Sequence, residues 1–574
     1  MALPIMLDEL RPFIDETLQL WDVPGMAVAV VKGNEVIVCE GFGKRNIASD
    51  LPVTADTIFP IASCTKAFTA MSVALLIDEG KLTWDTPIKE YMPDFQLADP
   101  VATNLTNARD LLAHRTGLPR HDLLWYASYF TCQDIFDRLR YLEPNKTFRA
   151  TWQYQNMMYM VAGLLVAHTT GMSWECCIQT QIFERLGMHQ SNLSTVQTKQ
   201  TDNFATPYQE RDGQIHEIPF FEQDGEHDAV GPAGSINSCV RDMAEWLKVQ
   251  LNNGQYNGEP FISAANLAEM HKPQIVIDNP DAQRFGFALN SYGLGWFMHA
   301  HKGRVLVHHG GNIDGFSALT SFMPQENLGI VVLTNGNHNA IPSVVSFTIY
   351  DRLLELDTTD WNGLYKPFYE EMKAAQTASK MHSGNKRKAD APLTHPLKAY
   401  MGEYEHPGYG VLSVEQKGEQ LQMTLNERFT LPLEHYHYDY FEGYFDRFDL
   451  SFKASFTTDA QGYISQVAIQ MEPNVKEIVF TRRPDPRMQD PAFLEQFIGT
   501  YDLMDKPMTV ALKQNALVLH LSGQPAYPLL PYQDTEFQLQ GLAGFSVAFQ
   551  QDATGKVTEA RLNQPNATFV ATRQ

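Results

Sequence analysis

Residues 58–66 read Ile-Phe-Pro-Ile-Ala-Ser-Cys-Thr-Lys. An apolar step leads to Ser63, and the residues that follow carry an apolar stripe at helical spacing, formed by Phe68, Met71, Ala74 and Leu75. We expect a helix that begins near Ser63 and ends at Gly80, because glycine suits a helix C-terminus. The spacing of i and i+3 then places Ser63 and Lys66 on one face of this helix, about one turn apart.

A lysine amine one turn from a serine hydroxyl can take its proton when burial keeps the amine neutral. The helix N-terminus also places backbone N–H groups beside the reacting oxygen. The S-x-x-K pattern alone favours a capping serine over a nucleophile. It recurs at Ser383-Gly-Asn-Lys386, where we expect a polar linker with no helix to align the two side chains. The context therefore singles out Ser63.

A second candidate motif is Tyr154-Gln-Asn156, which precedes a helix expected over Met157–His168. A tyrosine phenol can relay the proton of a nucleophile to a leaving group when nearby cations stabilise its anion. An asparagine two residues on can hydrogen-bond a substrate amide and the lysine. Taken alone, the motif is as well explained by a buried aromatic residue before a helix.

The third motif is His309-Gly-Gly-Asn312, at the end of an expected strand over Arg304–His308. Two glycines after a strand let the backbone approach a ligand closely. The N–H of Asn312 could join that of Ser63 in an oxyanion hole, with His309 as a polar or cationic group in the wall. His308 is an alternative, but strand alternation sends it to the opposite face.

S-x-x-K, Y-x-N and H-x-G, in this order and context, resemble the class C β-lactamase and D-alanyl-D-alanine peptidase group of serine hydrolases. The resemblance covers about residues 5–358. Three further stretches support it: Asp110-Leu-Leu-Ala-His-Arg-Thr-Gly-Leu-Pro119, Gly231-Pro-Ala-Gly-Ser-Ile-Asn-Ser238 and Tyr292-Gly-Leu-Gly-Trp-Phe297.

The resemblance implies a role for each motif residue. The implied catalytic residues are Ser63 as nucleophile, Lys66 as base, Tyr154 as proton relay and His309, which stands where many relatives place lysine. The implied substrate-binding residues are Asn156, Gly311 and Asn312. The histidine resembles the peptidase and esterase branch of the group and argues against strong β-lactamase activity.

The implied activity is cleavage of an amide or ester bond through an acyl-serine intermediate. We expect a peptidase or amidase that acts on small peptides, with D-residue peptides among the candidates. Three alternatives remain open at this point: a carboxylesterase with weak β-lactamase activity, a non-catalytic recognition protein related to penicillin-binding proteins, and a filament-forming protein.

At 574 residues the chain is too long for one core, and length suggests about three or four domains. A hairpin over Gly25–Cys39 and late strands up to Thr334 flank a helical middle, which predicts an α+β domain over residues 1–374 with one antiparallel sheet closed by both ends. Residues 375–392 have the composition of a polar linker. Two β-rich repeats follow, over residues 393–485 and 486–574.

The two repeats share landmarks. The first contains Tyr400-Met-Gly-Glu-Tyr404 and ends in Ile-Val-Phe-Thr-Arg, and the second contains Phe497-Ile-Gly-Thr-Tyr501 and ends in Phe-Val-Ala-Thr-Arg. Many short alternating strands in units of this size predict small antiparallel barrels. They resemble the eight-stranded, lipocalin-like barrels of D-aminopeptidase-type relatives.

The composition narrows the range of partners. A net charge of −23 argues against nucleic acid, whose binding needs Lys and Arg at phosphates. No apolar run approaches the roughly 20 residues of a membrane helix. The six cysteines form no zinc-binding set, and we expect no metal or other cofactor. The N-terminus lacks the pattern of a signal peptide, so a cytoplasmic protein is expected unless an export signal has been trimmed. The expected partner is a small-molecule or peptide substrate, and homo-oligomerisation stays open.

Overall fold

The computed structural model describes residues 3–574 except 127, 212, 222–228, 385–386, 389 and 446–449. The chain divides into two compact units. The first is Met1–Lys386 together with Glu472–Lys476, and the second is Arg387–Met471 together with Glu477–Gln574.

The first unit is built on a nine-stranded sheet in the order β10-β11-β12-β13-β14-β15-β1-β2-β3, with every described pair antiparallel. Its strands are β1 (Gly25–Lys32), β2 (Glu35–Asn46), β3 (Leu51–Pro52), β10 (Ile275–Val276), β11 (Ala288–Tyr292), β12 (Phe297–His301), β13 (Arg304–Ile313), β14 (Phe316–Met323) and β15 (Leu328–Thr334). β1 pairs with β2 on one side and with β15 on the other, from Met26 opposite Thr334 to Lys32 opposite Leu328. The predicted hairpin and the closure of one sheet by both ends of the domain are confirmed.

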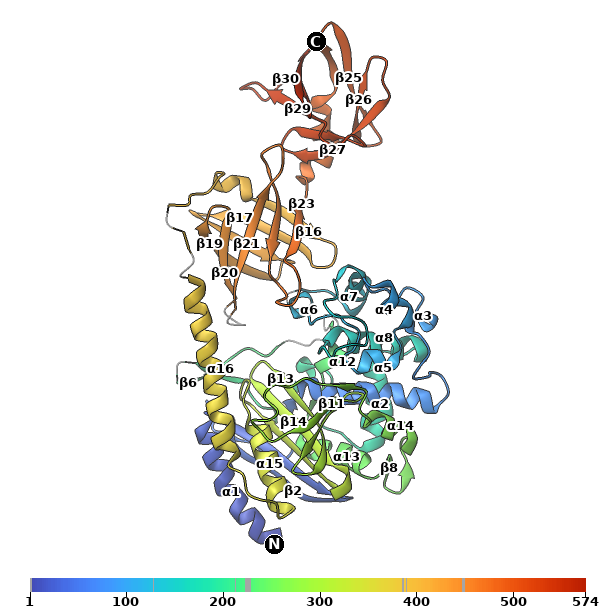
Figure 1. The fold of residues 1–574 in the computed structure, drawn as a ribbon, viewed down its shortest axis with the longest axis vertical. Coiled ribbons are helices and arrows are strands. Elements are labelled where there is room, and N and C mark those ends of the chain that lie inside the picture. Colours follow the sequence, from blue (N-terminus) through green and yellow to red (C-terminus); the bar gives the residue numbers. More distant parts are fainter. Residues whose placement is uncertain are drawn as a thin grey trace. The chain divides into compact units, whose positions relative to one another are not determined.

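Helices cover both faces of this sheet, which is why β1 is buried along almost its whole length. Val28 and Val30 belong to a core shared with α1 (Leu3–Leu20), α15 (Ile341–Leu353) and the start of α16 (Trp361–Gly384). α13 (Val240–Leu251) contacts β1 and β15. Figure 1 shows α1, α15 and α16 together on one side of the sheet.

The other α-helices of the first unit form the helical region. They are α2 (Thr65–Asp78), α3 (Ile88–Tyr91), α4 (Pro100–Leu105), α5 (Ala108–Leu112), α6 (Asp122–Tyr126), α7 (Cys132–Arg138), α8 (Asn156–Thr170), α9 (Trp174–Ile178), α10 (Glu184–Leu186), α11 (Thr195–Lys199), α12 (Gly231–Gly234) and α14 (Ala264–Met270). The expected helix after Ser63 is present as α2, which is buried all round and is followed by Gly80 in the left-handed conformation, with φ 71°. α8 likewise confirms the helix expected after the Tyr154 motif.

The expected linker requires a correction. α16 continues to Gly384, so residues 375–384 are helical and Ser383 lies in a helix rather than in an irregular segment. Trp361 belongs to the hydrophobic core that α1 and α15 form with the sheet. The residues after it are rich in good helix formers, which extend the helix. Polar composition alone does not separate an exposed helix from a linker. Lys386, the partner of Ser383 in the second S-x-x-K match, lies outside the described residues.

The second unit holds two closed antiparallel barrels of eight strands each. The repeat predicted small antiparallel barrels, and the resemblance to lipocalin-like barrels implied eight strands. The first barrel consists of β16 (Gly402–His406), β17 (Gly410–Lys417), β18 (Gln420–Leu425), β19 (Phe429–His437), β20 (Tyr440–Phe445), β21 (Leu450–Thr458), β22 (Ile464–Ile469) and β23 (Ile478–Arg482). The second consists of β24 (Gly499–Leu503), β25 (Lys506–Lys513), β26 (Ala516–Leu521), β27 (Ala526–Gln533), β28 (Glu536–Leu539), β29 (Ser546–Gln551), β30 (Val557–Gln564) and β31 (Ala567–Arg573).

The same pair of side chains closes both barrels. Arg482, at the end of the last strand of the first barrel, donates to the carbonyl oxygens of Ala399 at 2.8 Å and Ile464 at 3.0 Å. Arg573 occupies the equivalent place in the second barrel and donates to the carbonyl oxygen of Gln496 at 2.8 Å. The guanidinium groups lie 5.7 and 5.9 Å from the ring centres of Tyr404 and Tyr501, respectively. The repeated Tyr and Thr-Arg landmarks are therefore barrel-closing positions.

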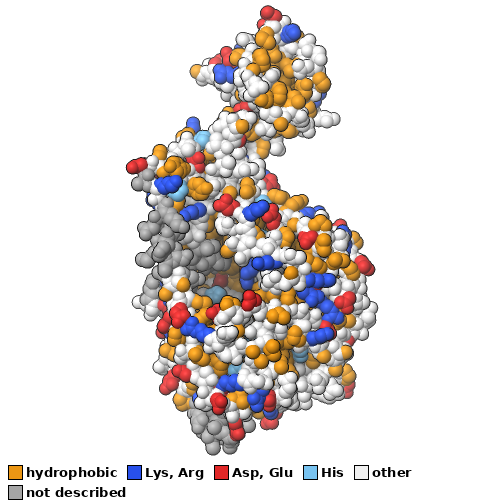
Figure 2. All heavy atoms as spheres, viewed as in Figure 1, with side chains coloured by type: hydrophobic (Ala, Val, Ile, Leu, Met, Phe, Trp, Pro, Cys, Tyr) orange, Lys and Arg blue, Asp and Glu red, His pale blue; other side chains and the backbone are white. Residues whose placement is uncertain are grey.

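On the face that Figure 2 shows, acidic and basic side chains are interspersed among scattered hydrophobic ones. Across the part of the chain that the structure describes, no helix combines the length and the apolar character needed to cross a membrane.

Candidate active site

Ser63 lies in a short 3-10 turn, Ala62–Cys64, between the apolar strand β4 (Phe59–Pro60) and α2. Ala62 has a φ of 47°, a left-handed conformation that costs a non-glycine residue on the order of 1–3 kcal/mol and that clusters at functional sites. β13 approaches this turn closely at Gly311. A Cβ on residue 311 would lie 2.1 Å from the carbonyl oxygen of Ile61 and 3.1 Å from the backbone nitrogen of Ser63. Glycine is therefore required here for contact between the H-x-G strand and the serine turn.

Lys66 is completely buried, and its amine has three partners. Nζ lies 3.0 Å from Oγ of Ser63, 2.8 Å from Oδ1 of Asn156 and 2.8 Å from the carbonyl oxygen of Ala233 in α12. The one-turn spacing predicted from the sequence thus brings the amine to the serine hydroxyl.

Burial lowers the pKa of Lys66 well below its usual value, and the positive charge of Arg120 lowers it further. This shift favours the neutral form of the amine, which has two N–H groups and one lone pair. Two of its three partners, the oxygens of Asn156 and Ala233, can only accept hydrogen bonds, so they take the two N–H groups. The lone pair is left facing the hydroxyl of Ser63.

Asn156 begins a polar chain that leads away from the nucleophile. While its Oδ1 accepts from Lys66, its Nδ2 donates to Oδ1 of Asp122 at 3.1 Å. Nε of Arg120 donates to Oδ2 of Asp122 at 2.5 Å. Nε1 of Trp125 also donates to Oδ1 of Asp122, at 2.8 Å. Both ends of the Asn156 amide are therefore engaged within the protein, and Arg120 is linked to the lysine through two side chains.

Tyr154 lies between the amine of Lys66 and the guanidinium of Arg120. Nζ of Lys66 is 4.7 Å from the centre of its ring, and the guanidinium of Arg120 is 4.9 Å from it. Burial raises the pKa of Tyr154 well above its usual value, while a hydrogen bond with Ser63 and the charge of Arg120 act in the opposite direction. The phenol is therefore protonated at neutral pH and can donate its proton.

His114 holds the backbone on both sides of Tyr154. Its carbonyl oxygen accepts from the N–H of Gln153 at 2.8 Å, and its Nδ1 accepts from the N–H of Gln155 at 3.0 Å. The imidazole lies 4.4 Å from the Tyr154 ring, centre to centre. Burial lowers the pKa of His114 well below its usual value, so it is neutral.

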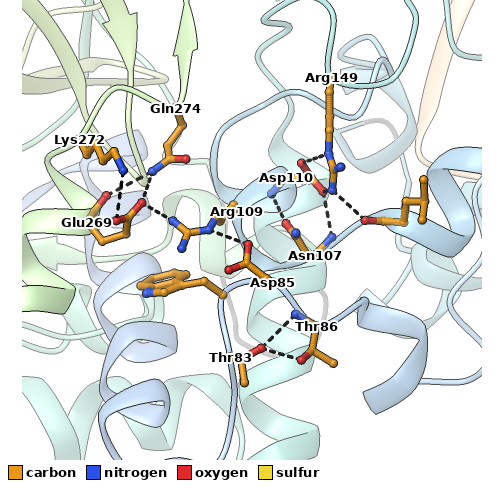
Figure 3. A network of polar contacts seen from close by, with 12 residues as sticks. Thr83, Asp85, Thr86, Asn107, Arg109, Asp110, Arg149, Glu269, Lys272 and Gln274 are labelled. Carbon is orange, nitrogen blue, oxygen red and sulfur yellow. Dashed lines mark hydrogen bonds and ion pairs between the residues drawn. The ribbon is translucent and has the colours of Figure 1, made fainter.

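An ion-pair network anchors the segment that carries His114 (Figure 3). The fully buried carboxylate of Asp110 accepts from Nε of Arg115 at 2.6 Å and from Nη2 of Arg149 at 2.7 Å. It also accepts from the N–H of Asn107 and so completes the capping box of α5. The stretch that begins at Asp110 is thus the support for the tyrosine.

His309 is buried, and both of its ring nitrogens are engaged. Nδ1 lies 2.6 Å from the carbonyl oxygen of Gly310, which can only accept, so Nδ1 carries the proton. Nε2 then accepts from the hydroxyl of Tyr292 at 3.0 Å. Burial lowers the pKa of His309 well below its usual value. His309 is therefore a neutral residue of the wall, held by Tyr292.

Asn312 lies on the outer part of β13, where its Oδ1 accepts from the hydroxyl of Ser317 at 2.8 Å. β12 pairs with β13 only as far as His308, so among the described strands β14 alone pairs with residues 309–313. This free edge of β13 faces the cavity. As predicted, His308 points to the other side of the strand from His309 and lies 3.1 Å from Nδ1 of His299.

The structure thus brings together Ser63, Lys66, Tyr154, Asn156, His309 and Gly311. Sequence reasoning missed Arg120, Asp122, His114 and Tyr292. Arg120 directly follows the Asp110–Pro119 landmark, and Tyr292 opens another landmark, so both signals were present without a role attached to them. Ala233 acts through its carbonyl oxygen, for which no side chain gives a signal.

A cavity of about 700 Å³ opens at this site, within the range of small-molecule sites. Ser63, Arg120, Tyr154, His309 and Asn312 are among its lining residues. Six free cysteines are present, and burial raises the pKa of Cys64, next to Ser63, to about 12, so it is not a competing nucleophile.

Two family models match the chain. The β-lactamase model matches residues 13–345, and a model described as a domain of unknown function (DUF3471) matches residues 386–482. The first match covers the sheet, the helical region and every residue of the site described above.

Among known proteins, the chain is similar to the unguisins hydrolase ungD of Aspergillus violaceofuscus, with 30% identity over 433 residues, 70% of this chain and 75% of that protein. It is also similar to protein flp of Staphylococcus aureus, with 26% identity over 59% of this chain and 64% of that protein. Among solved structures, an octameric penicillin-binding protein homologue from Pyrococcus abyssi has a similar fold, with a TM-score of 0.54 and 22% identity over 83% of this chain and 100% of that one.

Proposed function

Since the chain belongs to the β-lactamase family of serine hydrolases, we propose that it cleaves an amide bond in small peptides or related amides through an acyl-serine intermediate. The observation that carries the proposal is the arrangement of Lys66. A neutral amine has both N–H groups held by carbonyl oxygens and its lone pair directed at Oγ of Ser63, 3.0 Å away.

In the acylation step, Oγ of Ser63 attacks the substrate carbonyl carbon and its proton passes to Nζ of Lys66. The carbonyl oxygen becomes an oxyanion, which we assign to the backbone N–H groups of Ser63 and Asn312. The C–N bond then breaks as the phenol of Tyr154 gives its proton to the leaving nitrogen. Tyr154 recovers a proton from the lysine ammonium, which returns Lys66 to its neutral form.

Deacylation is the same sequence with water in place of the leaving amine. Water attacks the acyl carbon, and one of the protons of the water passes to the pair formed by Tyr154 and Lys66. Oγ of Ser63 then leaves and takes a proton back. Arg120 supports both steps, because its charge keeps the pKa of Lys66 low and stabilises the phenolate that forms at Tyr154. His309 and His114 help to position the aromatic side chains of the site, and neither residue gives or takes a proton in these steps.

The substrate class is inferred from the site and from the relatives. The cavity is large enough for a short peptide, and a relative of 30% identity is named a hydrolase. Peptides with D-residues are included in the proposal. An ester would react by the same steps, since an alkoxide leaving group is easier to expel than an amine.

A covalent probe and a substrate panel test the proposal together. A fluorophosphonate should label the wild-type protein and leave the Ser63→Ala variant unlabelled, while Ser383→Ala should label like the wild type. The panel consists of D- and L-aminoacyl amides, dipeptides and p-nitrophenyl esters. Labelling that survives in Ser63→Ala would rule out the nucleophile assignment, and an unlabelled wild type that turns over no substrate would rule out hydrolysis.

A further inference from the structure

The cavity at the active site reaches both faces of β13. Ser63, Tyr154 and His309 line it on the side of the helical region. His308, which points the other way from β13, and Phe347 of α15 also line it. Residues 309–313 have no β12 partner, so no described strand covers the edge of β13 that lies between the two faces.

The part of the cavity beyond this edge is lined largely by aromatic side chains. Phe287 lies 4.1 Å from His299 and 5.5 Å from Phe347, measured between ring centres. Phe347 lies 6.4 Å from Tyr365 of α16, and His299 lies 4.9 Å from His308. We call this part, lined by Phe287, His299, His308, Ser343, Phe347 and Tyr365, the aromatic chamber.

The aromatic chamber carries no formal charge. Burial lowers the pKa of His308 to about 4, and burial also lowers that of His299, so both imidazoles are neutral at physiological pH. Of the described residues that line the whole cavity, Arg120 and Asp278 are the charged ones, and neither belongs to the chamber. An uncharged group is therefore favoured there, since burying an unpaired charge is costly.

We propose that the aromatic chamber is a specificity pocket for an aromatic side chain next to the bond that is cleaved. Aromatic rings pack on one another at centroid distances of about 4.5–7 Å, and those in the chamber wall already do so with their neighbours. A substrate held beside Ser63 passes the uncovered edge of β13 and extends its side chain to the far face. This inference rests on the proposed function, because it names the substrate class of the same site.

Two amide series measure the preference without an aromatic leaving group to complicate it. One series varies the acyl residue, as alaninamide and phenylalaninamide of both configurations, with ammonia release as the readout. The other varies the leaving residue, as alanyl-alanine and alanyl-phenylalanine. In one of the two series the phenylalanine compound should have a kcat/KM about 100-fold higher, since even one methylene in a hydrophobic pocket is worth about 10–200-fold.

Variants of the residues that line the aromatic chamber then test whether the preference for phenylalanine arises there. Ser343→Phe places a ring in the chamber and should reduce the phenylalanine-to-alanine ratio to about one. Tyr365→Ala enlarges the chamber and should shift the preference toward 2-naphthylalanine. The matched control is Tyr369→Ala, one turn further along α16, where the ring contacts Trp21 and is not part of the cavity. It should leave the ratio unchanged, and melting temperatures confirm that each variant is folded.

The experiments distinguish a wrong inference about the aromatic chamber from a wrong proposal of hydrolase function. A protein that labels with fluorophosphonate and cleaves both members of each series equally would overturn the chamber and leave the hydrolase standing. If neither labelling nor cleavage occurs, binding of N-acetyl-phenylalaninamide and N-acetyl-alaninamide is compared by NMR titration. Tighter binding of the phenylalanine compound that Ser343→Phe abolishes would support the chamber, and equal binding would overturn it.

Discussion

The carbonyl oxygen of Ala233 lies 2.8 Å from Nζ of Lys66, so the main chain of α12 fixes one of the two N–H groups of the candidate base. Thr69, one turn further along α2, donates to the carbonyl oxygen of Pro232 at 2.6 Å and holds the same segment. The direction of the lysine lone pair therefore depends on how α12 packs against α2. It does not depend on any side chain of α12.

The pH dependence of hydrolysis should report the lysine amine. Only the neutral amine can accept the serine proton, so kcat/KM should fall as the pH drops through the pKa of Lys66. The charge of Arg120 is the second largest cause that lowers this pKa. Arg120→Gln should therefore raise the pKa and move the acidic limb of the kcat/KM profile to higher pH. Arg120→Lys keeps the charge and should move the limb less. A limb that stays in place in Arg120→Gln would contradict this electrostatic role.

Alanine should be tolerated very differently at the two neighbouring glycines of β13. In Gly311→Ala the new Cβ meets the carbonyl oxygen of Ile61 at 2.1 Å, so either β13 or the serine turn must move. We expect a loss of at least about 1–3 kcal/mol in the free energy of unfolding, together with loss of covalent labelling at Ser63. In Gly310→Ala the nearest atom is 3.7 Å away, so the melting temperature should stay close to that of the wild type. Equal melting temperatures for the two variants would refute the close approach.

Removing the carboxylate of Asp110 should destabilise the first unit by about 3 kcal/mol, because two arginines lose their buried partner. The value lies at the low end for buried pairs, since Arg149 and Arg115 keep 41% and 16% of their side-chain surface exposed. Urea unfolding of Asp110→Ala measures it. The control is Asp85→Ala in the same network (Figure 3), where the carboxylate is 75% exposed and the loss should stay below about 1 kcal/mol. Similar losses in both variants would mean that burial does not set the cost.

Nitrocefin should be a poor substrate, with a kcat/KM below about 10⁴ M⁻¹s⁻¹, the lower end of the usual enzyme range. A permanently charged lysine in the strand motif would attract the carboxylate of the drug. Here His309 is neutral, and both of its nitrogens are engaged by Gly310 and Tyr292. The measurement is steady-state hydrolysis at pH 7, with Ser63→Ala as the blank. A kcat/KM near 10⁶ M⁻¹s⁻¹ would contradict the inference drawn from the histidine.

The sequence was sufficient for the fold and for the centre of the site, for physical reasons. The period-2 and period-3.6 patterns reflect which residues are buried, so the β1–β2 hairpin, α2 and the barrels could be predicted. The spacing of Ser63 and Lys66 is local and follows from helix geometry. α16 was misjudged after residue 375, because an exposed helix and a polar linker share one composition.

The missed residues act through long-range geometry. Arg120 and Asp122 join the site through contacts with residues distant in sequence. The guanidinium of Arg120 lies 4.9 Å from the ring centre of Tyr154, and Asp122 accepts from Asn156, 34 residues further along the chain. Tyr292 reaches His309 because β11 and β13 flank β12 in the sheet. The protonation states also needed the structure, since they depend on burial. From the sequence His309 could equally have been a cation.

The closure of each barrel has a consequence for the tandem duplication of such domains. The last strand of each barrel pairs with its first, β23 with β16 and β31 with β24, so neither barrel has an open strand edge. Arg482 and Arg573 fasten the same ends through their hydrogen bonds. A duplicated barrel therefore adds no open strand edge that could pair with its neighbour. Each copy can then change its outward-facing residues, so that the two barrels of a tandem pair can diverge in sequence while both remain closed.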